Sequence, residues 1–69
     1  MTLEQFEQQY PNTPNFETLE AGTKIITHFG DVVTEGVFIR NMVKYGAKVV
    51  LFQAPTGEWA TSRKLVRLP

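Results

Sequence analysis

Cysteine is absent from this chain of 69 residues, and histidine and tryptophan each occur once. Without cysteine the chain can form neither disulfide bridges nor thiolate metal sites, and a lone histidine cannot assemble a zinc site. Long apolar runs are missing too, and the first twenty residues carry four glutamates in place of the basic and apolar segments of a signal peptide. We therefore expect no metal, no other cofactor and no membrane contact, and we expect a cytoplasmic protein.

A chain of this length is expected to form a single domain, residues 1–69. So small a domain buries only about 60% of the surface of its unfolded chain, which leaves its stability marginal. With neither a disulfide nor a metal to reinforce it, a well-packed barrel or self-association has to supply the stability. A homo-oligomer is therefore one candidate state.

The net charge of zero conceals a strong asymmetry between the two halves of the chain. Residues 1–35 contain six acidic residues and one lysine, whereas residues 36–69 contain six basic residues and one glutamate. Such a split is typical of contact with nucleic acid, but it also arises when two halves neutralise each other within one fold. Both explanations stay open, although an isoelectric point of about 6.5 is not that of a basic domain.

Residues 1–10 are predicted to form a short N-terminal α-helix. Thr2 and Gln5 fit a capping box at its start, and Leu3, Phe6 and Tyr10 fall on one face. The proline at position 11 ends the helix, because it disfavours a helical conformation in the residue before it. A helix this short must dock on something to be stable.

A connector, residues 11–21, follows the helix. Its prolines and asparagines are typical of turns, and Thr13-Pro14 is expected to open a short helical turn. Phe16 and Leu19 would then point inward.

Residues 22–69 are predicted to consist of strands and turns throughout. The second strand is expected to place Val37 and Ile39 in the core and Phe38 outside, and Gly36 predicts a bulge or bend. We expect a loop at residues 41–46 and turns at Gly30-Asp31, residues 54–57 and Arg63-Lys64. The expected strands are Thr23–Phe29, Val32–Arg40, Ala47–Ala54, Glu58–Ser62 and Leu65–Leu68.

The most apolar stretch of the chain is Ala47–Ala54, with four large apolar residues in a row. Because apolar and polar residues do not alternate along this run, both faces of this strand are expected to be covered. Val49 and Leu51 would fill the interior, and Val50 and Phe52 would lie beneath the N-terminal helix. The connector and a second copy of the chain are the other candidate covers.

Five short strands bent at glycines predict a mainly β fold, a small five-stranded antiparallel barrel with a short N-terminal helix. Residues 22–39, GTKIITHFGDVVTEGVFI, resemble a KOW motif, and the helix followed by five bent strands resembles the Sm-like layout. Residues 58–68, EWATSRKLVRL, are similar to the closing segment of Tudor-type and Src-homology-3 domains. The chain thus resembles the Src-homology-3-like barrel superfold, and the KOW and Sm-like resemblance implies RNA binding.

Signatures of catalysis are missing, so we expect no enzymatic activity. No phosphate-binding loop or nucleophile elbow occurs, and His28 with Asp31 is too weak a pattern for a catalytic dyad, so His28 is expected to be an exposed strand residue. Trp59 is the most informative side chain. It is either the lid of the core or an exposed binding platform, and both alternatives stay open.

Two functions of different classes follow from these patterns. The first is a regulatory protein-interaction module, an accessory subunit or phage-type inhibitor, that modulates a larger partner, with nucleic-acid-handling proteins among the candidates. The second is an RNA- or DNA-binding barrel. The residues expected to bind a protein partner are Trp59, Phe38, Tyr45, Arg40, Lys44 and Lys48. The residues expected to bind nucleic acid are Arg40, Lys48, Arg63, Lys64 and Arg67. Arg40 and Lys48 are expected to approach each other across a hairpin.

Overall fold

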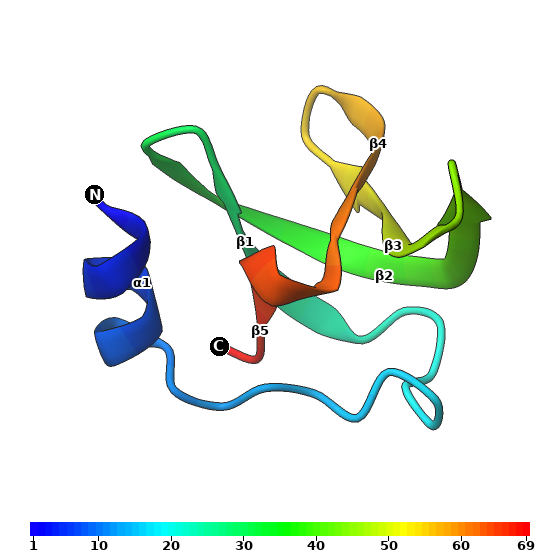
Figure 1. Cartoon of the computed structure of the whole chain (residues 1–69), viewed down its shortest axis with the longest axis horizontal. Helices are drawn as coiled ribbons and strands as arrows, with labels where there is room; N and C mark the ends of the chain where they lie inside the picture. The colour runs from blue at the N-terminus through cyan, green and yellow to red at the C-terminus, as the bar shows by residue number, and fades with distance from the viewer.

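The computed structural model describes all residues, 1–69, and its fold is mainly β. One short helix precedes five strands that form a single antiparallel sheet in the order β4-β3-β2-β1-β5 (Figure 1). The mainly β class and the N-terminal helix are therefore confirmed. The elements are α1 (Leu3–Gln9), β1 (Lys24–Phe29), β2 (Val32–Lys44), β3 (Ala47–Ala54), β4 (Gly57–Ser62), a 3₁₀ turn (Arg63–Leu65) and β5 (Val66–Arg67).

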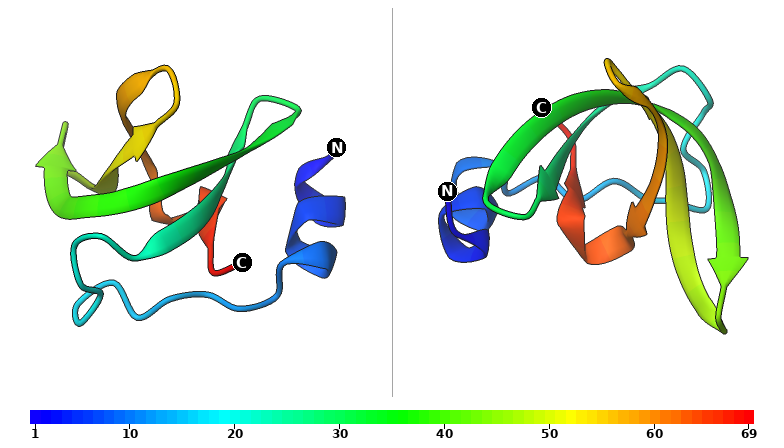
Figure 2. Two further views of the ribbon diagram at one scale, coloured as in Figure 1. Left: turned by 180° about the vertical axis from the view of Figure 1, so that it is seen from behind. Right: turned by 90° about the horizontal axis from the view of Figure 1, so that it is seen from above.

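The sheet arches strongly but does not close into the expected barrel (Figure 2). The last strand is only two residues long and pairs with β1 alone, through Ile26 opposite Arg67 and Thr27 opposite Val66. It therefore offers nothing for β4 to pair with. The outer side of β5 meets the connector, where the Leu68 N–H donates to the Asn12 carbonyl at 2.8 Å. The free edge of the sheet is β4.

Helix α1 begins and ends where the sequence predicts. The Thr2 hydroxyl accepts from the Gln5 N–H and the Gln5 side chain accepts from the Thr2 N–H, which completes the capping box. Phe6 is fully buried and packs against His28 of β1, with ring centroids 5.3 Å apart. The helix thus lies beside β1 and β5 (Figure 1), so the expectation that it covers β3 is wrong.

The bounds of β3 are confirmed, but its two faces are the reverse of those expected. Val50 and Phe52 point into the core, whereas Val49 and Leu51 are half-buried on the outer face. The core cluster consists of Phe16, Ile25, Phe38, Val50, Phe52, Ala54 and Val66.

The second strand shows the same inversion, and its bulge explains it. Phe38 is buried opposite Phe52 while Val37 is exposed, contrary to prediction. The register shifts between Phe38 and Arg40, not at Gly36, so the extra residue is Ile39. A bulge switches which positions of a strand face inward. Because the bulge was predicted at Gly36 and lies at Ile39, the residues between these two positions face the opposite way to the prediction.

Strand β2 also runs further than expected and replaces most of the predicted loop. Pairing with β3 continues to Lys44 opposite Ala47, and the chain reverses through Tyr45 and Gly46 alone. Both turn residues have positive φ, 53° and 76°, as a type I′ hairpin turn requires. In this register Arg40 faces Leu51 and Val43 faces Lys48, so the expected approach of Arg40 to Lys48 is wrong.

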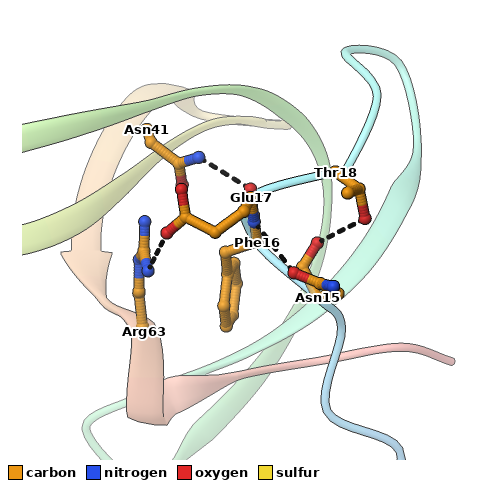
Figure 3. Close-up of polar contacts among 6 residues, drawn as sticks. All are labelled: Asn15, Phe16, Glu17, Thr18, Asn41 and Arg63. Carbon is orange, nitrogen blue, oxygen red and sulfur yellow. Dashed lines mark hydrogen bonds and ion pairs between the residues drawn. The ribbon is translucent and has the colours of Figure 1, made fainter.

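The connector contains a turn at Phe16–Thr18 instead of one opened by Thr13-Pro14. Asn15 organises it, because its side-chain oxygen accepts from the Glu17 N–H at 3.2 Å (Figure 3). Phe16 is buried and Leu19 packs against the core, as predicted. Asn41 of β2 fixes the connector by donating to the Phe16 carbonyl at 2.7 Å.

Candidate interaction surfaces

Trp59 lies on the inner face of β4, directly opposite Phe52 of the core, yet it remains 45% exposed. Its ring stands edge-on to Phe29 with centroids 5.7 Å apart, and its indole N–H donates to the Thr56 hydroxyl at 3.1 Å. One side of the ring therefore covers the core and the other meets solvent, and a role as a binding platform stays a prediction.

A groove opens beside Trp59, between the β1–β2 turn and the β3–β4 turn, both of which point to the top of Figure 1. Its volume is about 260 Å³. Three of its apolar side chains are substantially exposed: Phe29 by 46%, Val32 by 59% and Trp59 by 45%. We call it the aromatic groove, and its lining residues are Phe29, Val32, Thr34, Phe52, Ala54, Thr56 and Trp59.

The aromatic groove lies on the inner face of the arched, open sheet. The inner face of the sheet is covered by Phe16 and Leu19 of the connector but not beside the β1–β2 turn. The free edge of β4 borders the groove, so Trp59 stands on a strand whose outward backbone groups have no strand partner. Such a site can take an apolar side chain in the groove and an extended segment along the strand.

Sequence reasoning missed Phe29 and Val32 as surface residues. Phe29 was expected only as the end of one strand and Val32 only as the start of the next. Both flank the Gly30-Asp31 turn, and they form a directly opposed pair on the inner face. That pairing across a predicted turn was the available signal.

The predicted partner-binding residues fall into three places. Phe38 is a core residue and is not accessible to a partner. Trp59 lies opposite Phe52, near the end of β3 that is marked by Ala54. Tyr45, which is 98% exposed, lies in the turn at the other end of β3, and three exposed cations lie on the two strands of that hairpin. Those cations are Arg40, Lys44 and Lys48.

The hairpin segment, residues 40–51, extends beyond the neighbouring strands (Figure 2), and we call it the basic arm. It carries Arg40, Lys44 and Lys48, and it has no acidic residue. Val43 near its tip is 71% exposed. The strand pairing therefore places Val43 and Lys48 on one face of the hairpin and Arg40 and Lys44 on the other, and it separates all four from Trp59.

Two of the residues expected to bind nucleic acid make contacts within the chain. Arg63 forms an ion pair with Glu17 at 3.0 Å and lies over the Phe16 ring at 5.2 Å (Figure 3). Arg67 forms a longer pair with Glu7 at 3.7 Å and lies over the Phe6 ring at 5.7 Å. Each arginine thus holds one phenylalanine-glutamate pair of the acidic N-terminal segment. Lys64 is exposed, and Arg40 and Lys48 belong to the basic arm.

The remaining polar side chains include a buried histidine and no group that could hold a metal ion. His28 is buried, contrary to expectation, and its Nε2 lies 2.9 Å from the Met1 carbonyl. No three His, Asp or Glu side chains form a group that could hold a metal ion. The single α-helix is neither long nor apolar enough to cross a bilayer.

A second hollow, of about 380 Å³, is larger than the aromatic groove but less apolar. Four of its ten lining residues are hydrophobic, against five of seven in the groove. Lys24 and Glu35 are among those that line it. The aromatic groove is therefore the stronger candidate for binding an apolar group.

Comparison with models of known protein families, with curated proteins and with solved structures finds no match for this chain.

Proposed function

We propose that this chain is a non-enzymatic protein-interaction module that binds and modulates a larger partner through the aromatic groove. The observation that carries the proposal is the half-exposed trio Phe29, Val32 and Trp59 beside a free strand edge. Contiguous exposed apolar side chains are costly in water and typically mark an interface. An accessory subunit and an inhibitor of a larger enzyme are both consistent with such a module.

The binding mode follows from the two parts of the site. An apolar side chain of the partner fills the groove against Trp59, where aromatic anchors usually contribute most of the affinity. The preceding or following residues of the partner lie along β4 and take up its unpaired N–H and C=O groups. Alternate side chains of that segment then face the groove, which gives the interaction its sequence preference.

We also propose that the chain belongs to the Src-homology-3-like superfold in an open form. The strand order, the arch of the sheet and the 3₁₀ turn directly before β5 support this assignment. The superfold hosts many functions, so the proposal of partner binding depends on the groove and not on the fold.

Nucleic-acid binding is the weaker candidate, because the chain offers few free positive charges. Arg63 and Arg67 are paired with glutamates, so only three of the five predicted cations are free of ion pairs. Each free cation neutralises about one phosphate, which supports only weak, salt-sensitive binding. The experiment below nevertheless distinguishes the two functions.

The test is capture of a partner from native lysate on the tagged chain, with and without nuclease. The Val32→Lys variant puts a charge into the groove, and Val37→Lys puts the same charge on the outer face of the same strand. We expect one protein to be retained after nuclease treatment, lost with Val32→Lys and kept with Val37→Lys. Capture that disappears with nuclease, or equal loss with both variants, would refute the proposal.

The single tryptophan provides an independent readout of the same site. Because Trp59 is the only tryptophan, the emission of the chain reports its environment alone. Titration with the purified partner should shift this emission to shorter wavelength as the groove loses water. An unchanged spectrum on saturation would place the partner elsewhere.

A further inference from the structure

Tyr45 occupies a backbone position that does not suit it. Its φ is 53°, in the left-handed region that bulky residues rarely adopt, whereas hairpin turns of this kind favour Asn-Gly. The side chain is 98% exposed, and the only ring contact it makes is with the Lys44 amine, 5.9 Å from its centroid. Nothing within the fold offsets this strain, and unexplained strain at a conspicuous side chain points to a function outside the fold.

The cations of the basic arm also lack partners within the chain. Between Glu35 and Glu58 the only charged side chains are the three cations of the basic arm, and none of them takes part in an ion pair. Arg63 and Arg67 show that this chain does pair its cations where glutamates are within reach. Val43 adds an apolar side chain, directly across from Lys48.

We propose that the basic arm docks onto an acidic surface of a protein partner, with Tyr45 as its anchor. This deepens the proposed function and rests on it, because it names the chemistry of the partner at a second contact. Carboxylates of the partner pair with Arg40 and Lys44 on one face of the arm and with Lys48 on the other, while the Tyr45 ring at the tip and Val43 beside Lys48 meet apolar groups of the partner. Charge complementarity decides the occupant, and tyrosine is enriched among the residues that anchor interfaces.

A protein surface fits the arm better than a nucleic acid does. Three cations neutralise only a few phosphates, and the acidic residues elsewhere on the chain repel a polyanion. An acidic protein surface presents scattered carboxylates with apolar side chains among them, which matches both Val43 and Tyr45. Nucleic acid and a second copy of the chain are outcomes that the test separates.

The test measures binding of a fluorescein-labelled 16-residue peptide of glutamate and leucine to the full chain by anisotropy at low salt. We expect binding that weakens with added salt and that falls by about tenfold in Tyr45→Asn. The thermal unfolding midpoint of Tyr45→Asn should equal or exceed that of the wild type, because asparagine suits the turn. Loss of binding is then not loss of folding.

Matched variants locate the contact. Lys44→Gln on the arm should weaken peptide binding several-fold, whereas Lys64→Gln, an exposed lysine on the 3₁₀ turn, should not. A control peptide with glutamine in place of glutamate should not bind. Equal binding of the glutamine peptide, or undiminished binding by Tyr45→Asn, would overturn the proposal.

Two further outcomes identify a different occupant and also overturn it. Tighter binding of a 16-nucleotide oligouridylate than of the peptide would assign the arm to nucleic acid. A sedimentation mass that rises with concentration and falls in Tyr45→Asn would assign it to a second copy.

Val32→Lys separates the two proposals: if this variant loses the captured protein while the peptide never binds to the full chain, only the proposal about the basic arm fails. If the peptide binds but no protein survives nuclease treatment, only the proposed function fails.

Discussion

Gly36 is the position where one added carbon atom should reduce the stability of the fold most. A Cβ placed on it would lie 2.7 Å from Cδ2 of Phe52 and 3.0 Å from the carbonyl oxygen of Gln53. Favourable carbon contacts are about 3.5–4.0 Å, so the Phe52 contact is too short by roughly 1 Å. Phe52 is buried in the core, and Gln53 belongs to the backbone paired with β2, so neither neighbour moves freely.

The magnitude of Gly36→Ala follows from two opposing effects. Over-packing of a well-filled core costs about 1–3 kcal/mol. Replacing glycine by alanine restricts the unfolded chain and returns about 0.4–1 kcal/mol. We expect a net loss of about 1–2 kcal/mol in the free energy of unfolding, which lowers the unfolding midpoint of so small a domain by about 5–15 °C.

Urea and thermal unfolding followed by circular dichroism measure this loss. Glu35→Ala, the exposed neighbour, is the control and should stay within about 0.5 kcal/mol of the wild type. Combining Gly36→Ala with Phe52→Leu should cost less than the sum of the two single changes, because the smaller side chain relieves the contact. Unchanged stability of Gly36→Ala, or strict additivity in the double variant, would refute the account.

Two further predictions concern the N-terminal segment. Thr2→Ala removes the side-chain acceptor of the capping box and should lower the free energy of unfolding by about 1 kcal/mol, measured in urea, whereas Thr13→Ala, whose hydroxyl makes no hydrogen bond, should have little effect. Asn41→Ala leaves the Phe16 carbonyl without its donor and should cost about 1–3 kcal/mol in the same assay. A cost below about 0.5 kcal/mol would show that Asn41 does not hold the connector in place.

The parts of the fold that local chemistry decides could be predicted from the sequence. The capping residues of α1, the bounds of β3 and the inward side chains of Phe16 and Leu19 depend on near neighbours along the chain. The faces of β2 and β3 could not be assigned, since the position of the Ile39 bulge is set by pairing between the strands. A shift of one residue exchanges inner and outer faces, so Phe38 moved from the predicted surface into the core.

The candidate surfaces were only partly predictable for a related reason. The basic residues and Tyr45 are visible in the sequence, but their distance from Trp59 depends on the length of the β2–β3 hairpin. The aromatic groove depends on how the ends of four strands meet across the arch of the sheet, which is a property of the whole fold. Phe29 and Val32 are apolar strand residues by local criteria, and their position on either side of the predicted turn is the one sign in the sequence that they form a pair at the surface.

The two arginine contacts with phenylalanine-glutamate pairs have a consequence for the order in which the chain folds. Strands β1 to β4 pair with sequence neighbours through two-residue turns, which form quickly because little loop entropy is lost. The contacts of Arg63 with Glu17 and of Arg67 with Glu7 join opposite ends of the chain and must form later. A seven-residue helix is not stable alone, so α1 and β5 should detach and reattach as one cooperative unit. Hydrogen exchange should therefore be fast and concerted at both chain ends, while the four-stranded meander stays protected.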